Sequence, residues 1–415
     1  MTGRYKVITG YLAFWFFLVF FKFGAGLQYT LLSPLGARVL PLWVVGAVIF
    51  VSSIFQMFLD VPVGFLLDKY RYKKMLMVGT AITFLGVVAF LYGITTISLL
   101  ASIFLVAVGW TFYTPGTNAY LLSHAKKSTS VKFFAYHDVF ASLGIAVGVM
   151  VVPFIVNATG YVISLWLSVA IILALIAIYL APKDIKKITM NTSPHRRTHH
   201  QRRYVLTNIY AAIKRLTPAS TLLLLLNCAA GIFYGIVWFI VPLIIAMAVY
   251  NGALLSAGLA SLDFAVVIIA SFLSGKSKKS LKKMIFTGLL VFSLSGFLLG
   301  MSFGILFIIF AVLSTIGEEM ASLPLWAWLH ELDETHNQDG LMSGLISLSA
   351  DVGWAIGPLS AGILYQWVGP SLAIELGAIP IAAVLLVYYF ATRTRVITLS
   401  LFTVPPKPHY PRHKS

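Results

Sequence analysis

The sequence predicts an all-α membrane protein with twelve transmembrane helices in two six-helix bundles and with both termini in the cytoplasm. The first observation is composition: 59% of the 415 residues are hydrophobic and only 10% are charged, whereas soluble proteins carry about 25% charged residues. The second is that apolar runs of about 20 residues, long enough to cross a bilayer as a helix, recur along the chain. The third is that basic residues gather in alternate loops. This composition excludes a soluble enzyme and a disordered chain.

The expected helices follow the apolar runs in order, and turn residues or charged residues separate them. Ser33-Pro34 is expected to end the first, Lys276 to Lys283 to separate the eighth from the ninth, and Gly369-Pro370 to precede the last. The expected ranges are 9–32, 41–67, 75–95, 98–122, 133–156, 161–181, 219–242, 253–274, 284–301, 304–329, 341–366 and 371–391. The first run is too long for a cleaved signal peptide, and we expect it to be a helix of the mature protein.

The positions of the basic residues determine the expected topology. Of the 30 Lys and Arg residues, 28 fall on one side of the helices, while Arg38 falls in a loop on the other side and Lys22 lies inside a helix. Cytoplasmic loops carry the excess of Lys and Arg, so both termini are predicted to be cytoplasmic. This placement also explains the net charge of +17 without nucleic acid as a partner. The single cysteine, Cys228, excludes an internal disulfide.

The chain divides into two halves that resemble each other weakly. We expect an N-terminal bundle over 1–181, a basic cytoplasmic linker with an interfacial amphipathic helix over 182–218, a C-terminal bundle over 219–392 and a basic tail over 393–415. At an offset of 209 residues, Gly26 matches Gly235, and other glycines match at helix-packing positions. These further pairs are Gly79 with Gly288, Gly144 with Gly353, Gly148 with Gly357 and Gly160 with Gly369. Such a parallel repeat is typical of transporters built from two six-helix bundles.

One local motif carries a family resemblance. Gly64 lies near the cytoplasmic end of the second expected helix, and Asp68-Lys69 precedes a basic turn with Arg71, Lys73 and Lys74. This segment resembles the loop 2–3 signature of the major facilitator superfamily, with Arg71 in place of a customary glycine. The resemblance implies an alternating-access transporter in which these residues act in gating.

Ionisable residues inside the expected helices need a functional reason, because each costs at least about 2.5–3.5 kcal/mol at the bilayer centre. These residues are Lys22, Asp60, Asp138, Asp263, Glu318, Glu319 and Asp351. In the family that the chain resembles, the helices that carry them line the central cavity. We expect Glu318 or Glu319, with Asp263 and Asp351, to carry protons or to hold a cationic group, because a buried carboxylate is protonated more readily. Lys22 is expected either to anchor an anion or to pair with an acid that fixes helix packing.

Aromatic and polar side chains recur at helical spacing on the first, seventh, tenth and eleventh expected helices, and the fourth carries two further candidates. They are candidates for the cavity wall, with helix packing as the alternative. The candidates are Trp15, Tyr29, Tyr113, Asn118, Asn227, Tyr234, Trp238, Trp326 and Trp354.

The loop between the tenth and eleventh expected helices is acidic, in contrast to the basic loop 2–3. We expect Glu331, Asp333 or Glu334 to pair with Arg71, Lys73 or Lys74 when the cytoplasmic side is closed. The alternative is a solvated acidic loop, since exposed ion pairs contribute only about 0–1 kcal/mol each.

The function expected from these features is secondary transport of a small molecule, coupled to protons, with efflux of amphipathic or cationic compounds ahead of uptake. Uptake of a nutrient or organic anion through Lys22 is the alternative, and a non-transporting receptor of the same fold is the alternative from another class. No nucleophile elbow, metal-ligand spacing or phosphate-binding loop is found, so we expect no enzyme, no cofactor and no metal. The expected partners are a small substrate, protons and anionic lipid around a monomer in the plasma membrane.

Overall fold

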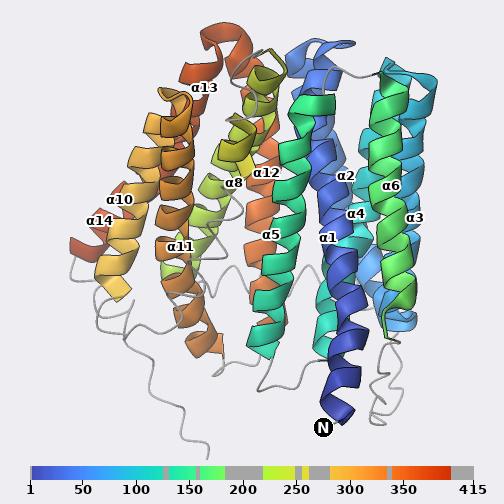
Figure 1. Ribbon diagram of the computed structural model, residues 1–415. Coiled ribbons are helices and arrows are strands. Elements are labelled where there is room, and N and C mark those ends of the chain that lie inside the picture. Colours follow the sequence, from blue (N-terminus) through green and yellow to red (C-terminus); the bar gives the residue numbers. More distant parts are fainter. Residues whose placement is uncertain are drawn as a thin grey trace, which may run out of the picture.

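A computed structural model describes residues 2–124, 130–155, 159–182, 218–247, 255–260, 281–333 and 339–393, in which helices are joined by short turns and no strand occurs (Figure 1). Within them, nine helices are long and apolar enough to cross a membrane. The part of the chain that the structure describes therefore has the form of an integral membrane protein.

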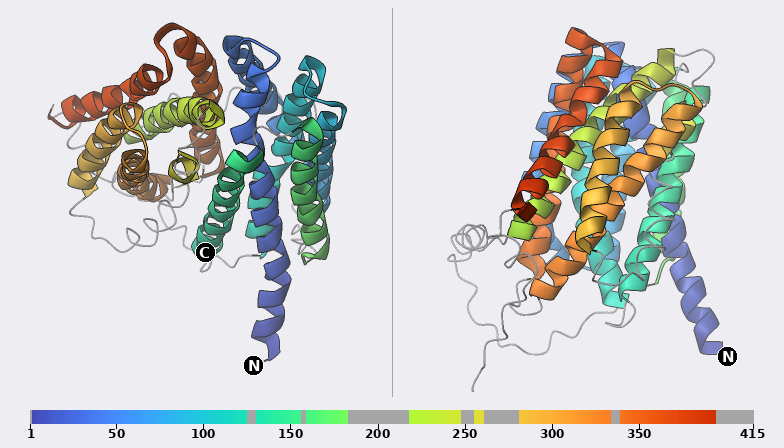
Figure 2. Two further views of the ribbon diagram at one scale, coloured as in Figure 1. Left: turned by 45° about the horizontal axis from the view of Figure 1, so that its top comes forward. Right: turned by 90° about the vertical axis from the view of Figure 1, so that its left-hand side faces the viewer.

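The first half of the chain forms one group of helices. Helix α1 contacts α5 and α6, α3 contacts α4 and α6, and α2 contacts α4 (Figures 1 and 2). Their bounds are α1 (Thr2–Ala37), α2 (Leu42–Lys69), α3 (Tyr72–Val88), the 3-10 helix η1 (Ala89–Tyr92), α4 (Thr96–His124), α5 (Ser130–Ile155) and α6 (Gly160–Leu180).

The second half forms another group of helices. Helix α8 contacts α12 and α14, and α10 contacts α11, α13 and α14. Their bounds are α8 (Pro218–Met247), α10 (Leu281–Gly300), α11 (Ile305–Asp333), α12 (Asp339–Val368), α13 (Pro370–Gly377) and α14 (Ile379–Arg393). Of the predicted helix 253–274, residues 255–260 are helical, and the remainder, including Asp263, lies outside the described residues. The linker and tail, including the predicted amphipathic helix, lie outside them as well, so the domain division stays a prediction.

Two proline positions show where the predicted helix ends were wrong. Ser33-Pro34 does not end the first helix, because α1 continues through Pro34 to Ala37. Pro34 only lacks the N–H that would bond to the Thr30 carbonyl, and this loss is tolerated in membrane helices. The last predicted helix is instead divided at Ala378 into α13 and α14. Pro380 explains the break, since its ring would clash with the carbonyl of the residue four positions earlier.

The glycines that match at the 209-residue offset lie where helices cross. A Cβ added at Gly26 would lie 2.5 Å from the Ile145 carbonyl oxygen of α5. In the second half, a Cβ at Gly235 would lie 3.0 Å from the Cα of Gly357 on α12. Helix α1 thus crosses α5 as α8 crosses α12, with the backbones close enough that only glycine fits.

Substitution at one of these crossings is expected to destabilise the fold. In Gly353→Leu the new side chain would overlap the Cys228 carbonyl and approach the Gly231 Cα, which lies 2.9 Å from an added Cβ. Overpacking of this kind costs about 1–3 kcal/mol, so the thermal unfolding temperature in detergent should fall. Leu348→Phe on the exposed face of α12, where Leu348 is 43% exposed, is the control and should unfold as the wild type does.

The two groups of helices meet closely at one end. Helix α2 packs on α12, and α1 packs on α8. A Cβ at Gly46 would overlap the Pro358 carbonyl and lie 3.2 Å from the Leu359 Cα, and one at Gly362 would lie 2.6 Å from the Leu42 carbonyl oxygen. These contacts lie toward the start of α2 and the end of α12, opposite the end that holds the N-terminus in Figure 1.

At the N-terminal end, a lysine of the loop 2–3 motif holds the last turn of α6. The Lys73 Nζ donates hydrogen bonds to the carbonyl oxygens of Tyr179, at 2.7 Å, and Ala181, at 2.5 Å. The Tyr120 hydroxyl donates to the Pro182 carbonyl at 2.9 Å. The last carbonyls of a helix lack partners within the helix and attract cations. Lys73 and Tyr120 therefore hold the carbonyl groups of residues 179–182 at the end of α6 in place.

Removal of this cation is expected to loosen the end of α6. Lys73→Met removes the hydrogen bonds that a charged donor makes to the end of α6. Because the site is partly exposed, we expect the free energy of unfolding to fall by about 1 kcal/mol, which is within the range for such bonds. The control is Lys74→Met, since Lys74 lies 5.9 Å from the Tyr70 ring and its loss removes no helix cap. Hydrogen exchange at residues 176–181 should increase in the first variant only; equal exchange in both variants would contradict this role of Lys73.

The gating pairs predicted for this end stay a prediction. The structure does not describe the surroundings of Gly64, the side chains of Asp68, Lys69, Glu331 and Asp333, or any part of Glu334. In the described conformation Lys73 contacts the end of α6.

Candidate functional site

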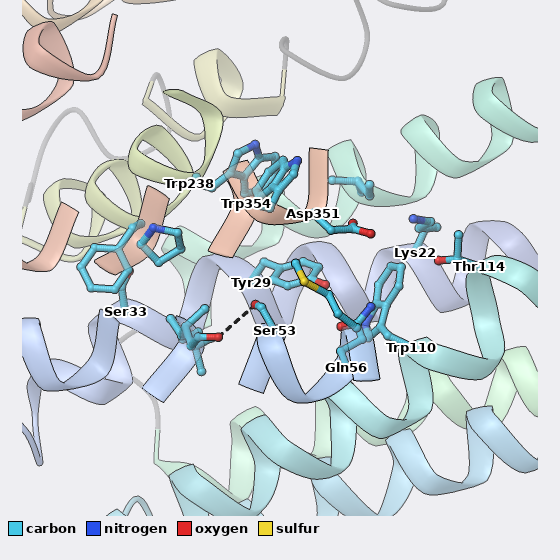
Figure 3. Close-up of a pocket in the computed structure, with 17 residues that line it drawn as sticks. Lys22, Tyr29, Ser33, Ser53, Gln56, Trp110, Thr114, Trp238, Asp351 and Trp354 are labelled. Atoms are coloured by element: carbon cyan, nitrogen blue, oxygen red, sulfur yellow. Dashed lines mark hydrogen bonds between the residues drawn. The ribbon is translucent and has the colours of Figure 1, made fainter. Parts of the chain in front are cut away.

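A cavity of about 350 Å³ lies between the two halves (Figure 3). Helices α1, α2, α4 and α5 form one wall, and α8 and α12 form the other. Its lining consists of Lys22, Tyr29, Leu32, Ser33, Ile49, Ser53, Gln56, Met57, Trp110, Thr114, Ile145, Gly235, Trp238, Phe239, Asp351, Trp354 and Pro358. The close packing of α2 on α12 next to Pro358 borders one side of this cavity.

Aromatic rings hold the ammonium group of Lys22 at the cavity wall. Its Nζ lies 4.4 Å from the centroid of the Trp110 ring and 4.9 Å from that of Tyr113. A cation over such ring faces gains electrostatic attraction that partly replaces lost hydration. The Tyr113 ring is itself fixed by stacking on Phe21, with 4.4 Å between ring centroids. Lys22 therefore carries its charge on a rigid base that faces the cavity.

The opposite wall carries an acid with tryptophans beside it. Asp351 and, one helical turn later, Trp354 line the cavity from α12, and Trp238 lines it from α8. Tyr29 lies close enough to Asp351 to interact with its charge, and its ring lies 5.8 Å from that of Trp110. In Figure 3 the side chains of Lys22 and Asp351 both point into the space that these rings enclose. The cavity thus holds opposite charges on walls that belong to different halves.

Hydroxyl and amide groups add hydrogen-bonding capacity along α1, α2 and α4. Ser53 donates to the Ile49 carbonyl at 2.9 Å, whereas Ser33, only 1% exposed, has no hydrogen-bond partner for its hydroxyl among the described residues. Gln56 and Thr114 also line the cavity. A buried hydroxyl without a partner costs free energy.

A second acidic position lies within the C-terminal group of helices. Glu318 on α11 lies beside the hydroxyl of Tyr234 on α8, and Ser314 and Thr315 surround the same hydroxyl. The Tyr234 ring stacks on Phe292, with 5.7 Å between centroids. Tyr234 precedes Gly235, which lines the cavity, so α8 connects the acidic position to the cavity wall.

The structure divides the predicted site residues into three sets. Five of them, Lys22, Tyr29, Trp238, Asp351 and Trp354, line the cavity together. Others lie elsewhere in the described chain: Trp15 stacks on Phe140, Tyr113 lies under Lys22, Tyr234 lies beside Glu318, and neither Glu319 nor Asn227 is among the lining residues. The positions that the structure leaves undescribed are the side chains of Asp60, Asn118, Asp138 and Trp326 and the whole of Asp263.

Several lining residues were not predicted. Trp110 and Thr114 share a helical face with Tyr113 and Thr117, and this spacing was a usable signal. Ser33 was missed because it was assigned to a break rather than to α1. Ser53 and Gln56 are ordinary polar residues of an apolar helix and gave no distinct signal. The described residues contain no group of three or more side chains suited to a metal ion.

The family of the chain is shown by its similarity to known sequences. The sequence profile of the Major Facilitator Superfamily matches residues 10–332, which is most of the chain. The chain belongs to this family. It is therefore an integral, multi-pass membrane protein of a transporter family, and the resemblance carried by the loop 2–3 motif is confirmed. No curated protein matches the sequence.

Solved transporter structures share the fold. A POT family transporter in complex with 5-aminolevulinic acid is 13% identical and aligns with a TM-score of 0.67 over 95% of this chain and 96% of its own. A POT family transporter in complex with a thioalcohol conjugated peptide is 16% identical, with a TM-score of 0.66 over 92% and 96%. A point mutant of the nucleoside transporter NupG is 12% identical, with a TM-score of 0.70 over 91% and 98%.

Proposed function

We propose that this protein is a secondary transporter that moves a small molecule across the plasma membrane by alternating access. One observation carries the proposal: a cavity lies between the two halves, and each half contributes a charged side chain to it, Lys22 on α1 and Asp351 on α12. A ligand that contacts both charges would couple its binding to the relative position of the halves.

The described conformation is best interpreted as inward-facing. The N-terminal end of the bundle carries the basic positions Arg71, Lys73, Lys74 and Lys283 near the starts of α3 and α10, which supports a cytoplasmic location. The close contacts between α2 and α12 then lie on the outer side. In this assignment the outer side is closed in the described conformation.

Proton coupling is the proposed energy source. Glu318 lies beside Tyr234 within the span Ile305–Ser322, and an acid inside the membrane is costly unless it has a function. Glu318 is separate from the lining of the cavity but is joined to it through α8. Protonation of Glu318 would change the packing of α8 on α11, and α8 in turn contacts α1 and α12.

For the direction, export of an amphipathic or cationic compound is the first candidate. Three tryptophans and Asp351 in the cavity wall support it. Uptake of a nutrient or organic anion is the second candidate, and the presence of Lys22 in the same cavity favours it.

A compound screen followed by a flux measurement tests this function. Purified protein is screened by thermal shift against compound classes at an acidic and an alkaline pH, because a ligand that binds the folded state raises its stability. Compounds that stabilise the protein are then followed in proteoliposomes with and without a pH gradient. We expect flux that reverses when the gradient is reversed, and flux that is indifferent to the gradient would contradict proton coupling.

A further inference from the structure

The cavity carries one cationic and one anionic side chain on walls that belong to different halves of the protein. Lys22 lies on α1 and Asp351 on α12, and both line the same space of about 350 Å³. Cavities that bind small molecules measure about 300–1,000 Å³, so this one suits a small ligand. The two charged groups define what kind of ligand it takes.

The Lys22 end is built to receive an anion. The Trp110 and Tyr113 rings, at 4.4 and 4.9 Å, hold the ammonium group from the side of the protein. The positive charge that these rings hold at the cavity wall attracts the carboxylate of a ligand, which would accept a charge-assisted hydrogen bond from the ammonium group. Thr114 on the same wall adds a hydroxyl.

The Asp351 end is built to receive a cation. Its carboxylate lies in the wall with Trp354 and Trp238, and Tyr29 lies close enough to interact with its charge. Negative charge together with the faces of aromatic rings favours an ammonium group. The ring of Tyr29, 5.8 Å from that of Trp110, makes an apolar wall that continues between the two charged positions.

The geometry points to a zwitterion as the substrate class: a small molecule whose carboxylate binds Lys22, whose ammonium group binds Asp351 and whose apolar body lies against the aromatic wall. This inference rests on the proposed transport function and specifies its substrate. A molecule with both charges can form a charge pair with each half at once, whereas one with a single charge forms a charge pair with only one of them. The zwitterion therefore has the larger effect on the equilibrium between conformations.

Two matched series of compounds test the inference by binding to the purified full-length protein. The first consists of phenylalanine, its amide, which lacks the negative charge, and hydrocinnamate, which lacks the positive charge. The second consists of ε-aminocaproate, hexylamine and caproate, in which the two charges are further apart. The dissociation constant of each compound is measured for the wild type and for Lys22→Met, Lys22→Arg, Asp351→Asn and Asp351→Glu.

We expect at least one zwitterion to bind about tenfold more tightly than both of its single-charge analogues, as one hydrogen-bonded charge pair implies. Lys22→Met should remove the preference over the amine or amide, and Asp351→Asn should remove the preference over the acid. Lys22→Arg and Asp351→Glu keep the charges and should keep both preferences. Unchanged elution and thermal unfolding of each variant show that it is folded.

The inference and the proposed function fail in different ways. Three results would overturn the inference. The first is tighter binding of a single-charge analogue in both series, and the second is the absence of binding by both zwitterions. The third is a preference for the zwitterion that survives both Lys22→Met and Asp351→Asn. If a single-charge analogue binds more tightly and a pH gradient drives its flux, the proposed transport function is still supported. Selective binding of a zwitterion that no gradient drives across proteoliposomes supports the inference and contradicts the proposed function.

Discussion

Gly46→Leu is expected to slow transport strongly while the protein remains folded. The added side chain would overlap the Pro358 carbonyl, where α2 packs on α12 between the two halves. Overpacking costs about 1–3 kcal/mol, and here the two halves can relieve that cost by separating at this end. Such an energy shifts an equilibrium between two conformations by about five- to 150-fold. Substrate flux in proteoliposomes should fall accordingly.

The control for Gly46→Leu is Val51→Trp on the same helix, where Val51 is 52% exposed. This larger substitution does not touch α12 and should leave the flux close to that of the wild type. Gly362→Leu, which would approach the Leu42 carbonyl from the other helix, should reproduce the defect. Normal flux in both glycine variants would show that this packing is not part of the transport cycle.

Glu318→Gln is expected to uncouple transport from the proton gradient. Each unit of pH difference supplies about 1.4 kcal/mol per proton, which is about a tenfold accumulation of substrate. A glutamine cannot release or bind the proton, so accumulation driven by the gradient should disappear. Exchange of labelled for unlabelled substrate needs no net proton movement and should continue. Both are measured in the same proteoliposomes.

Two comparisons make the Glu318 result specific. Tyr234→Phe removes the hydroxyl that lies beside Glu318 and should weaken coupling, while the ring still stacks on Phe292. Glu319→Gln neutralises the adjacent acid, and we expect it to retain accumulation. Accumulation that persists in Glu318→Gln but is lost in Glu319→Gln would move the coupling role to Glu319.

The described helices could be predicted from the sequence because membrane length and hydrophobicity constrain them strongly. The errors lie at Pro34 and Pro380, because a proline in an apolar segment can either end a helix or be accommodated within it. Proline ended the prediction at residue 32, but α1 continues through it, since a membrane helix tolerates one missing hydrogen bond. At Pro380 an uninterrupted apolar run concealed the break between α13 and α14.

The candidate site was predicted through its charges and only partly through its other residues. Lys22 and Asp351 were found because a charge in an apolar helix is rare and costly. Tyr234 and Trp238 lie one helical turn apart on α8 and were both candidates for the cavity wall, yet the two side chains have different neighbours, Glu318 and the cavity. Helical spacing alone does not distinguish such neighbours, because the choice depends on how α8 lies between α11 and α12. Ser53 and Gln56 could be assigned only from the structure.

Cysteine accessibility tests the central claim, that the cavity between the halves opens to the two sides of the membrane in turn. Cys228 is the single cysteine, so Cys228→Ser gives a background without thiols, into which Thr114→Cys places one thiol at an exposed position of the cavity wall. A membrane-impermeant maleimide is applied to right-side-out and to inside-out vesicles. We predict fast labelling from the cytoplasmic side and slow labelling from outside, with this order reversed when Gly46→Leu is added. Labelling from one side only, unchanged by Gly46→Leu and by bound substrate, would contradict alternating access.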